Sequence, residues 1–204
     1  MEQEIVNWQD LNLQSMDLIL CAGESGMSKR IRRFQWITGV WGDACDLSHV
    51  GAIRVNSYGH ALIQESTSLN KWADKSGVQE NLLHEWLPQY NGKVFVRKLD
   101  FERTVEFNDA DFLFWMNHKD DPYEHGIPGA VELLLCVLRM NRFFPNYTPK
   151  ITTVPHCTEL DAWRLKEHDL MLIDSVANRL PPWMWWSMID DLLKCPVGKP
   201  IRIK

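Results

Sequence analysis

The sequence predicts an α+β fold, because strand patterns dominate its first half and helical patterns dominate its second half. The strand patterns are short apolar or alternating runs between turn residues, and the helical patterns recur every three or four residues. No internal repeat and no linker-like stretch separates the two halves. A chain of 204 residues can bury a normal hydrophobic core, so we expect a single domain over residues 1–204.

Four strands are expected in the first half of the chain. Their bounds are Asp17–Cys21, His49–Val55, His60–Ser66 and Lys93–Leu99. The second and third flank an Asn-Ser-Tyr-Gly sequence, which is typical of a hairpin turn. A turn centred on Ser57 would place His49 opposite Glu65 and Ile53 opposite Ala61, with each facing pair on one side of the sheet.

Helical spacing marks further segments. These are Ser25–Thr38, Leu82–Leu87, Asp109–Asn117, Gly129–Phe144, a helix that begins near Cys157, and Pro182–Leu193. Gly39 and Pro88 are expected to end the first two, because glycine favours a helix C-terminus and proline disrupts a helix interior. Pro182 suits the first turn of the last helix.

The charges of the chain indicate which kinds of binding partner to expect. The formal net charge is −5, so nucleic acid is not expected as the main partner. The run Lys29–Arg33 is a local exception, because four of its five residues are basic. It is interpreted first as a solvated helix face, and second as a contact with an anionic substrate or a peripheral contact with a membrane surface.

The N-terminal sequence MEQEIVNWQD is acidic and polar, unlike a secretory signal. No apolar run approaches the ~20 residues that span a bilayer. The five cysteines are Cys21, Cys45, Cys136, Cys157 and Cys195, an odd number without close pairs. We therefore expect a cytoplasmic protein with reduced thiols, and a viral or phage protein acting in a host cell also fits.

Two features of the sequence could supply chemistry. A carboxylate beside an imidazole fixes the ring tautomer and raises its basicity, so a Glu65–His49 pair could serve a general base, although such pairs are more often structural. Cys157 follows Pro155-His156 and precedes a helical pattern. A thiol at a helix N-terminus lies at the positive end of the helix dipole, which favours the thiolate. The alternative for any cysteine is a buried, unreactive side chain, and this alternative suits Cys21, Cys136 and Cys195.

Four short segments carry motifs of one known family. They are Met16–Gly23 (MDLILCAG), Leu47–Ile53 (LSHVGAI), Ala61–Ser66 (ALIQES) and His156–Trp163 (HCTELDAW). In this order they resemble the permuted NlpC/P60 group of papain-like cysteine hydrolases, which includes YiiX-like bacterial proteins and a related poxvirus protein. Asp121–Glu124 (DPYE) is similar to a further family element upstream of the cysteine.

The resemblance implies a circularly permuted papain-like fold, with an antiparallel sheet or small barrel packed against helices. It implies a thiol hydrolase in which Glu65 orients His49, His49 takes the proton of Cys157, and an acyl-enzyme forms on that sulfur. No metal and no cofactor are expected. Further candidates for substrate or oxyanion contacts are Tyr123, His156 and Ser48.

The sequence departs from the family at three places. His156 stands where the family has an aromatic residue, and Asp120 stands where it has a glycine. The stretch between Tyr123 and Cys157 is longer than usual. We therefore expect a helical insertion around 124–150, and a C-terminal helical tail over 168–204.

Several functions remain open. A peptidase or amidase is expected first, and a lipid or acyl-ester hydrolase or acyltransferase of the same fold is the alternative. A non-enzymatic interaction module is a further one, because Trp183, Trp185 and Trp186 lie together in a chain of ten tryptophans and could contact protein or lipid. A metal site at His49, His156 and Cys157 is disfavoured, because the metal-ligand spacings are missing.

Overall fold

The computed structural model describes residues 4–37, 39–67, 76–122, 157–172, 181–187 and 189–204. A six-stranded antiparallel sheet forms its centre, with the strand order β4-β3-β2-β1-β5-β6. The strands are β1 (Leu18–Gly23), β2 (His49–Val55), β3 (Ala61–Thr67), β4 (Gly77–Leu82), β5 (Gly92–Arg97) and β6 (Ile201–Arg202). The structure is therefore of the α+β class, as predicted.

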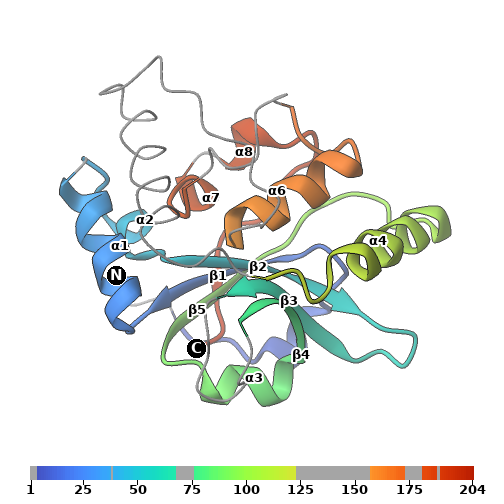
Figure 1. Cartoon of the computed structure of the whole chain (residues 1–204), viewed down its shortest axis with the longest axis horizontal. Helices are drawn as coiled ribbons and strands as arrows, with labels where there is room; N and C mark the ends of the chain where they lie inside the picture. The colour runs from blue at the N-terminus through green and yellow to red at the C-terminus, as the bar shows by residue number, and fades with distance from the viewer. Residues whose placement is uncertain (1–3, 38, 68–75, 123–156, 173–180, 188) are drawn as a thin grey trace.

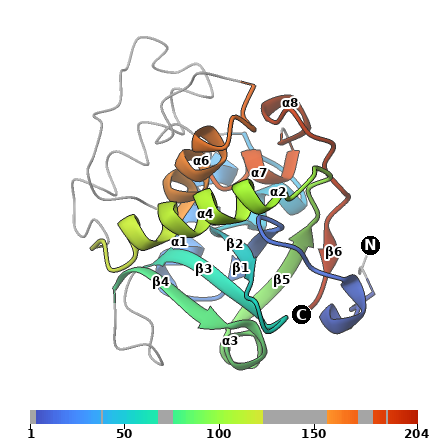
Figure 2. The ribbon, with the colours of Figure 1, turned by 90° about the vertical axis from the view of Figure 1, so that its right-hand side faces the viewer.

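Helices cover both faces of this sheet (Figure 1). The α-helices are α1 (Gly26–Ile37), α2 (Asp43–Asp46), α3 (Leu83–Gln89), α4 (Val105–His118), α6 (Cys157–Glu167), α7 (Met184–Ser187) and α8 (Ile189–Leu192). A short 3₁₀ helix, η1, spans Trp8–Leu11. Helices α6, α7 and α8 lie over one face and α3 lies over the other, while α1 and α2 lie at one end (Figure 1). The turned view shows α4 beside α6 (Figure 2).

Strand β1 is buried on both sides, which explains its continuous apolar sequence. Leu18 and Leu20 point into the cluster beneath α6, α7 and α8. Ile19 and Cys21 point into the second cluster, which includes side chains of α3. Successive side chains of a strand project to opposite faces, so one short segment supplies both halves of the core.

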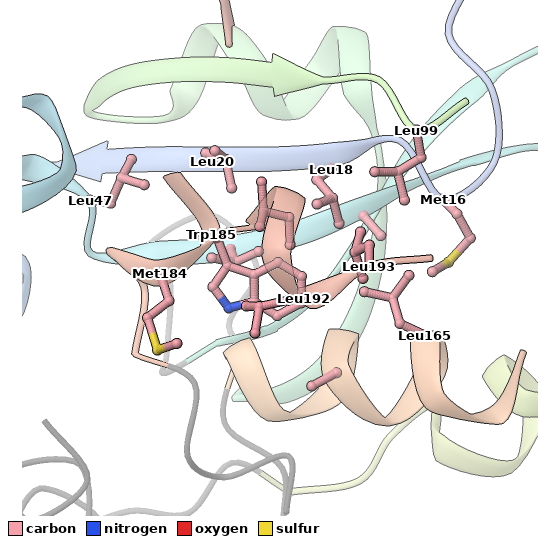
Figure 3. Close-up of a cluster of buried hydrophobic side chains, with 14 of the residues drawn as sticks. Met16, Leu18, Leu20, Leu47, Leu99, Leu165, Met184, Trp185, Leu192 and Leu193 are labelled. Atoms are coloured by element: carbon pink, nitrogen blue, oxygen red, sulfur yellow. The ribbon is translucent and has the colours of Figure 1, made fainter. Parts of the chain in front are cut away.

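The C-terminal tryptophans pack onto the core. Trp185 is fully buried among the apolar side chains between the sheet and α6, where Figure 3 places it beside Met184 and Leu192. Trp183 and Trp186 are partly buried against the same cluster. The tryptophan-rich segment is therefore held against the core.

The register of the β2–β3 hairpin differs from the prediction. Ile53 pairs with Ile63 rather than with Ala61. The loop is centred on Tyr58 instead of Ser57, because the Asn56 N–H donates to the His60 carbonyl at 3.0 Å and closes a longer turn. Since the shift is two residues, every side chain keeps its predicted face.

Other boundaries also differ. The helix α3 continues through Pro88 to Gln89, because the proline lies in the last turn, where the Tyr90 N–H still donates to the Trp86 carbonyl at 3.0 Å. The segment predicted as one helix over Pro182–Leu193 contains two short helices, α7 and α8. The tail is not purely helical, since it ends in β6. Strands β4 and β6 were not predicted, and the expected Gly129–Phe144 helix lies outside the described residues.

Candidate functional site

His49 and Glu65 meet on neighbouring strands. His49 is the first residue of β2, and Glu65 lies in β3. The Nε2 atom of His49 lies 2.6 Å from Oε2 of Glu65. The His49 side chain is 13% exposed and that of Glu65 is 2% exposed, so the contact is shielded from water at the carboxylate end.

Two neutral donors hold the other oxygen of Glu65. The indole N–H of Trp86 donates to Oε1 at 3.0 Å, and the side-chain amide of Gln79 donates to the same atom at 3.3 Å. Trp86 belongs to α3, and Gln79 lies directly opposite Glu65 on β4. Two further elements therefore fix the carboxylate, while Oε2 is left for the imidazole.

Gly51 makes room for this arrangement. A Cβ atom at Gly51 would lie 2.9 Å from the Gln64 carbonyl oxygen and 3.3 Å from Cβ of Glu65. The first contact is shorter than real Cβ contacts allow, and it involves backbone that cannot move away cheaply. The glycine two residues after His49 in the LSHVGAI segment thus permits the close approach of β2 and β3.

Cys157 is the first residue of α6, and its side chain hydrogen-bonds to the His49 ring. The helix packs against β2 and β3, which brings the thiol to the His49–Glu65 pair. Because Nε2 of His49 faces Glu65, Nδ1 is the ring nitrogen left for the thiol. Cys157 as a whole is 8% exposed, so it is buried at the start of the helix.

The environment favours a charged His49. Burial by itself lowers the pKa of the ring, but the charge and hydrogen bond of Cys157, together with those of Glu65, raise the pKa well above its ordinary value. The arrangement therefore stabilises an imidazolium next to the Cys157 sulfur. An imidazolium beside a cysteine is the setting that activates a thiol as a nucleophile.

A second thiol lies next to the site but is held in the neutral form. Cys21 on β1 pairs directly with His49 and is fully buried. Burial, and then the charge of Glu65, raises the pKa of Cys21 well above its usual value, although a hydrogen bond with Tyr90 opposes the shift. The two thiols therefore differ, because Cys21 is held protonated whereas Cys157 hydrogen-bonds to the His49 ring.

Asp161 lies one helical turn after Cys157 and is 1% exposed. Neither of its carboxyl oxygens has a hydrogen-bond partner among the described residues. Burial raises the pKa of Asp161 to about 7, against the lowering effect of the Arg164 and His49 charges. A buried carboxyl without partners is costly when ionised, so this group is held largely protonated below neutral pH.

The remaining predicted site residues fall into two groups. Ser48 is buried, and its hydroxyl accepts a hydrogen bond from the Gly23 N–H at 3.1 Å, so it joins the loop before β2 to the end of β1. Tyr123 and His156 lie outside the described residues. Cys136 does as well, whereas Cys195 is a free, buried thiol.

Trp86, Gln79 and Asp161 were not identified from the sequence. Trp86 occurs in an apolar helical pattern, and Gln79 occurs in a strand that was not predicted, so neither carried a signal. Asp161 did carry one, because a residue four positions after Cys157 on a helix lies on the same side as the thiol.

No cluster of three or more His, Cys, Asp or Glu side chains suited to a metal ion occurs in the described part of the chain. Within the same residues, no helix combines the length and the apolar character that crossing a membrane requires.

Comparisons with known proteins find a likeness among solved structures. No family model matches the chain, and no curated protein matches it. Among solved structures, it is similar to the crystal structure of the metalloprotein yiiX from Escherichia coli O157:H7, with 17% sequence identity and a TM-score of 0.49. The match covers 76% of this chain and 66% of the yiiX chain, so this chain spans just under two thirds of its neighbour. The neighbour thus carries the name of the YiiX-like group that the four sequence motifs resemble.

Proposed function

We propose that this protein is a papain-like thiol hydrolase that cleaves an amide or ester bond through an acyl-enzyme on Cys157. The observation that carries the proposal is the His49 ring, which contacts the Glu65 carboxylate at 2.6 Å and hydrogen-bonds to the Cys157 thiol. A buried imidazole between a carboxylate and a thiol at a helix start is the geometry that nucleophilic cysteine catalysis requires.

The proposed reaction begins with proton transfer from the Cys157 sulfur to His49, whose positive charge Glu65 stabilises. The thiolate attacks the carbonyl carbon, and the resulting oxyanion accepts a hydrogen bond from a backbone N–H in the first turn of α6, where these groups lack partners within the helix. His49 then returns its proton to the leaving amine or alcohol, which departs and leaves a thioester on Cys157. Water activated by His49 hydrolyses the thioester and restores the thiol.

The chain order of the site fits the permuted arrangement that the motifs predict. The base and its carboxylate lie on β2 and β3, and the nucleophile follows much later at the start of α6. In the family that the motifs resemble, a permuted member has this order. We propose the permuted papain-like fold on this basis.

A thiol-labelling experiment tests the proposal. The rate at which iodoacetamide alkylates Cys157 is measured against pH, and mass spectrometry locates the label. We expect fast labelling at neutral pH in the native protein and a rate roughly 10- to 100-fold lower in His49→Ala, because an unpaired thiol is only a few per cent ionised there. His60→Ala is the matched control, since His60 is an exposed loop residue.

Equal labelling rates in the native protein and in His49→Ala would overturn the proposed pair. Turnover is then tested with peptide amides and with acyl esters, using Cys157→Ala as the inactive control. Amide cleavage is expected first, and cleavage of acyl esters alone would assign the protein to the alternative class. Fast Cys157 labelling without turnover of either kind would favour a module that retains the fold without its activity.

A further inference from the structure

Helix α1 and the loop after it expose a cluster of large apolar side chains. Trp36 is 55% exposed, Ile37 is 61% exposed and Trp41 is 68% exposed. The rings of Trp36 and Trp41 meet edge to face, with their centroids 6.0 Å apart. An exposed pair of indoles beside an aliphatic side chain is unusual for a surface that faces only water.

Basic side chains lie on the same side of α1. Lys29, Arg30 and Arg33 are exposed. Lys29 lies seven residues before Trp36, Arg30 lies seven residues before Ile37, and Arg33 lies three and four residues before them, which places all five along one side of the helix. Lys29 contacts Glu24 at 3.4 Å across an exposed surface. For Arg30 and Arg33, no ion pair occurs with any described residue.

The opposite side of α1 determines this orientation. Gln35 is fully buried, and its amide donates to the carbonyl oxygens of Cys45 and Leu47 at 2.9 and 2.8 Å. These two bonds hold that side of the helix against α2 and the segment before β2. The basic–aromatic face, which we define as Lys29, Arg30, Arg33, Trp36, Ile37 and Trp41, therefore points away from the core.

We propose that the basic–aromatic face docks the protein onto an anionic membrane surface. Indole rings partition into the interface between headgroups and acyl chains, where Ile37 can also bury its side chain. The cations complement a negatively charged leaflet. The formal net charge of the chain is −5, so the electrostatic attraction to an anionic membrane comes from these basic residues on one side of α1 and not from the chain as a whole.

Two other occupants fit the face less well. In a symmetric dimer, the same patch meets itself, so the basic side chains of both copies would share one interface and repel each other. A nucleic acid would match the cations, but Ile37 has no ring to stack on a base, whereas it can bury its side chain in a membrane interface.

The face also adjoins the candidate site. Helix α1 begins three residues after the end of β1, and Cys21 of β1 pairs with His49. At Gly23, a Cβ atom would lie 2.5 Å from the Ser28 hydroxyl, so the first turn of α1 packs directly on the end of that strand. Docking would therefore hold the site close to the headgroup layer.

Vesicle co-sedimentation of the full chain tests the proposal without any activity measurement. The vesicles are pure phosphatidylcholine or phosphatidylcholine with phosphatidylserine. We expect binding only to the vesicles with phosphatidylserine, and weaker binding at high salt. Each basic residue near such a surface contributes roughly a five-fold change in affinity, so Arg30→Glu/Arg33→Glu is expected to weaken binding by at least about 25-fold.

Trp36→Ala/Trp41→Ala is expected to weaken binding about tenfold or more, because both exposed rings lose their interfacial contact. The control is Lys93→Glu/Lys199→Glu, which changes net charge equally at exposed positions outside α1 and keeps native binding. Absence of binding to the anionic vesicles, or equal loss in the control, would overturn the proposal. A concentration-dependent dimer that Trp36→Ala/Trp41→Ala abolishes would also overturn it, in favour of a second copy.

Discussion

Two buried clusters each combine a histidine with a carboxylate, and they differ in how the negative charge is balanced. The Glu65 cluster consists of Glu65, His49, Gln79 and Trp86, and its donors other than histidine are neutral. The Asp111 cluster consists of Asp111, Arg164 and His168, in which the guanidinium of Arg164 binds both carboxylate oxygens. It joins α4 to the C-terminal half of α6.

This difference separates a structural ion pair from the proposed site of proton transfer. Burial by itself raises the pKa of Asp111, but the Arg164 charge and the hydrogen bonds from His168 and Arg164 lower the pKa to about 2. The Asp111 charge is therefore permanent and already neutralised. Glu65 has no such partner among the described residues, so its charge is best balanced when His49 carries a proton.

The largest expected effect comes from breaking the Asp111 cluster. Arg164→Met leaves a buried carboxylate without its cation, which is expected to lower the free energy of unfolding by about 3–5 kcal/mol. Denaturant unfolding measures this loss. The double variant Arg164→Met/Asp111→Leu removes both charges and should recover most of the stability. A single-variant loss below about 1 kcal/mol would contradict a structural role for the ion pair.

The next prediction compares how two carboxyl groups make stability depend on pH. Asp161 belongs to α6, and Asp111 of α4 contacts α6 through Arg164. An unfolded Asp ionises near pH 4, whereas Asp161 in the folded state ionises at about 7. As the pH rises from 4 to 7, only the unfolded state releases this proton, so the free energy of unfolding falls by up to about 4 kcal/mol and then levels off. Asp111 behaves oppositely, because its stabilisation is complete above pH 4 and is lost as the pH falls through about 2.

Asp161→Asn should remove the fall in the free energy of unfolding between pH 4 and 7. The loss of stability near pH 2, which comes from Asp111, should remain. Urea unfolding across this pH range gives the difference between the native protein and the variant. A difference that is independent of pH would show that Asp161 is not held protonated.

Glu65→Gln tests the other cluster with little change in shape. Loss of the negative charge leaves His49 without its counter-ion, so hydrolysis of a substrate is expected to fall about 100-fold or more. The free energy of unfolding should change by only about 1 kcal/mol, because the amide still fills the same space. Asp111→Asn is the matched change, and it should reverse the pattern by reducing stability while Cys157 labelling persists. Equal effects of the two variants on labelling would contradict the distinction between the clusters.

The smallest effect is expected at Gly51. A methyl group there contacts the Gln64 carbonyl and Cβ of Glu65, so Gly51→Ala should displace the carboxylate and slow Cys157 alkylation about tenfold. Gly26→Ala is the control, because a Cβ at Gly26 meets nothing within 4 Å and alanine favours a helix. Alkylation at the native rate in Gly51→Ala would show that the close approach of β2 and β3 is not needed.

Much of the sheet could be predicted from the sequence, because local patterns determine it. The strand His49–Val55 was predicted with the bounds that the structure has, since apolar residues and a turn signal delimit it. The two-residue error in the hairpin register arose because Asn56 and His60 close a longer loop. Local sequence does not show which backbone N–H and carbonyl groups of a turn hydrogen-bond to each other. Strand β4 carries three polar residues in six, so it gave no alternating pattern.

The candidate site likewise contains residues that the sequence predicted and residues that it did not. His49, Glu65 and Cys157 were predicted from motifs, and the structure places them together. Trp86 and Gln79 could not be found, because their role depends on α3 and β4 meeting one carboxylate from different directions. The Asp111 cluster was also missed, although His168, which directly follows α6, is only four residues from Arg164 in that helix. Their partner is on another helix, and long-range pairing leaves no trace in a single sequence.

The order of the site along the chain has a consequence for biosynthesis. The strands β1–β5 leave the ribosome before α6, so the imidazole and its carboxylate can assemble while the sulfur has not yet been made. A nascent chain therefore cannot form the proposed Cys157–His49 pair until α6 reaches the finished strands. Any reactivity during translation is limited by the docking of that helix.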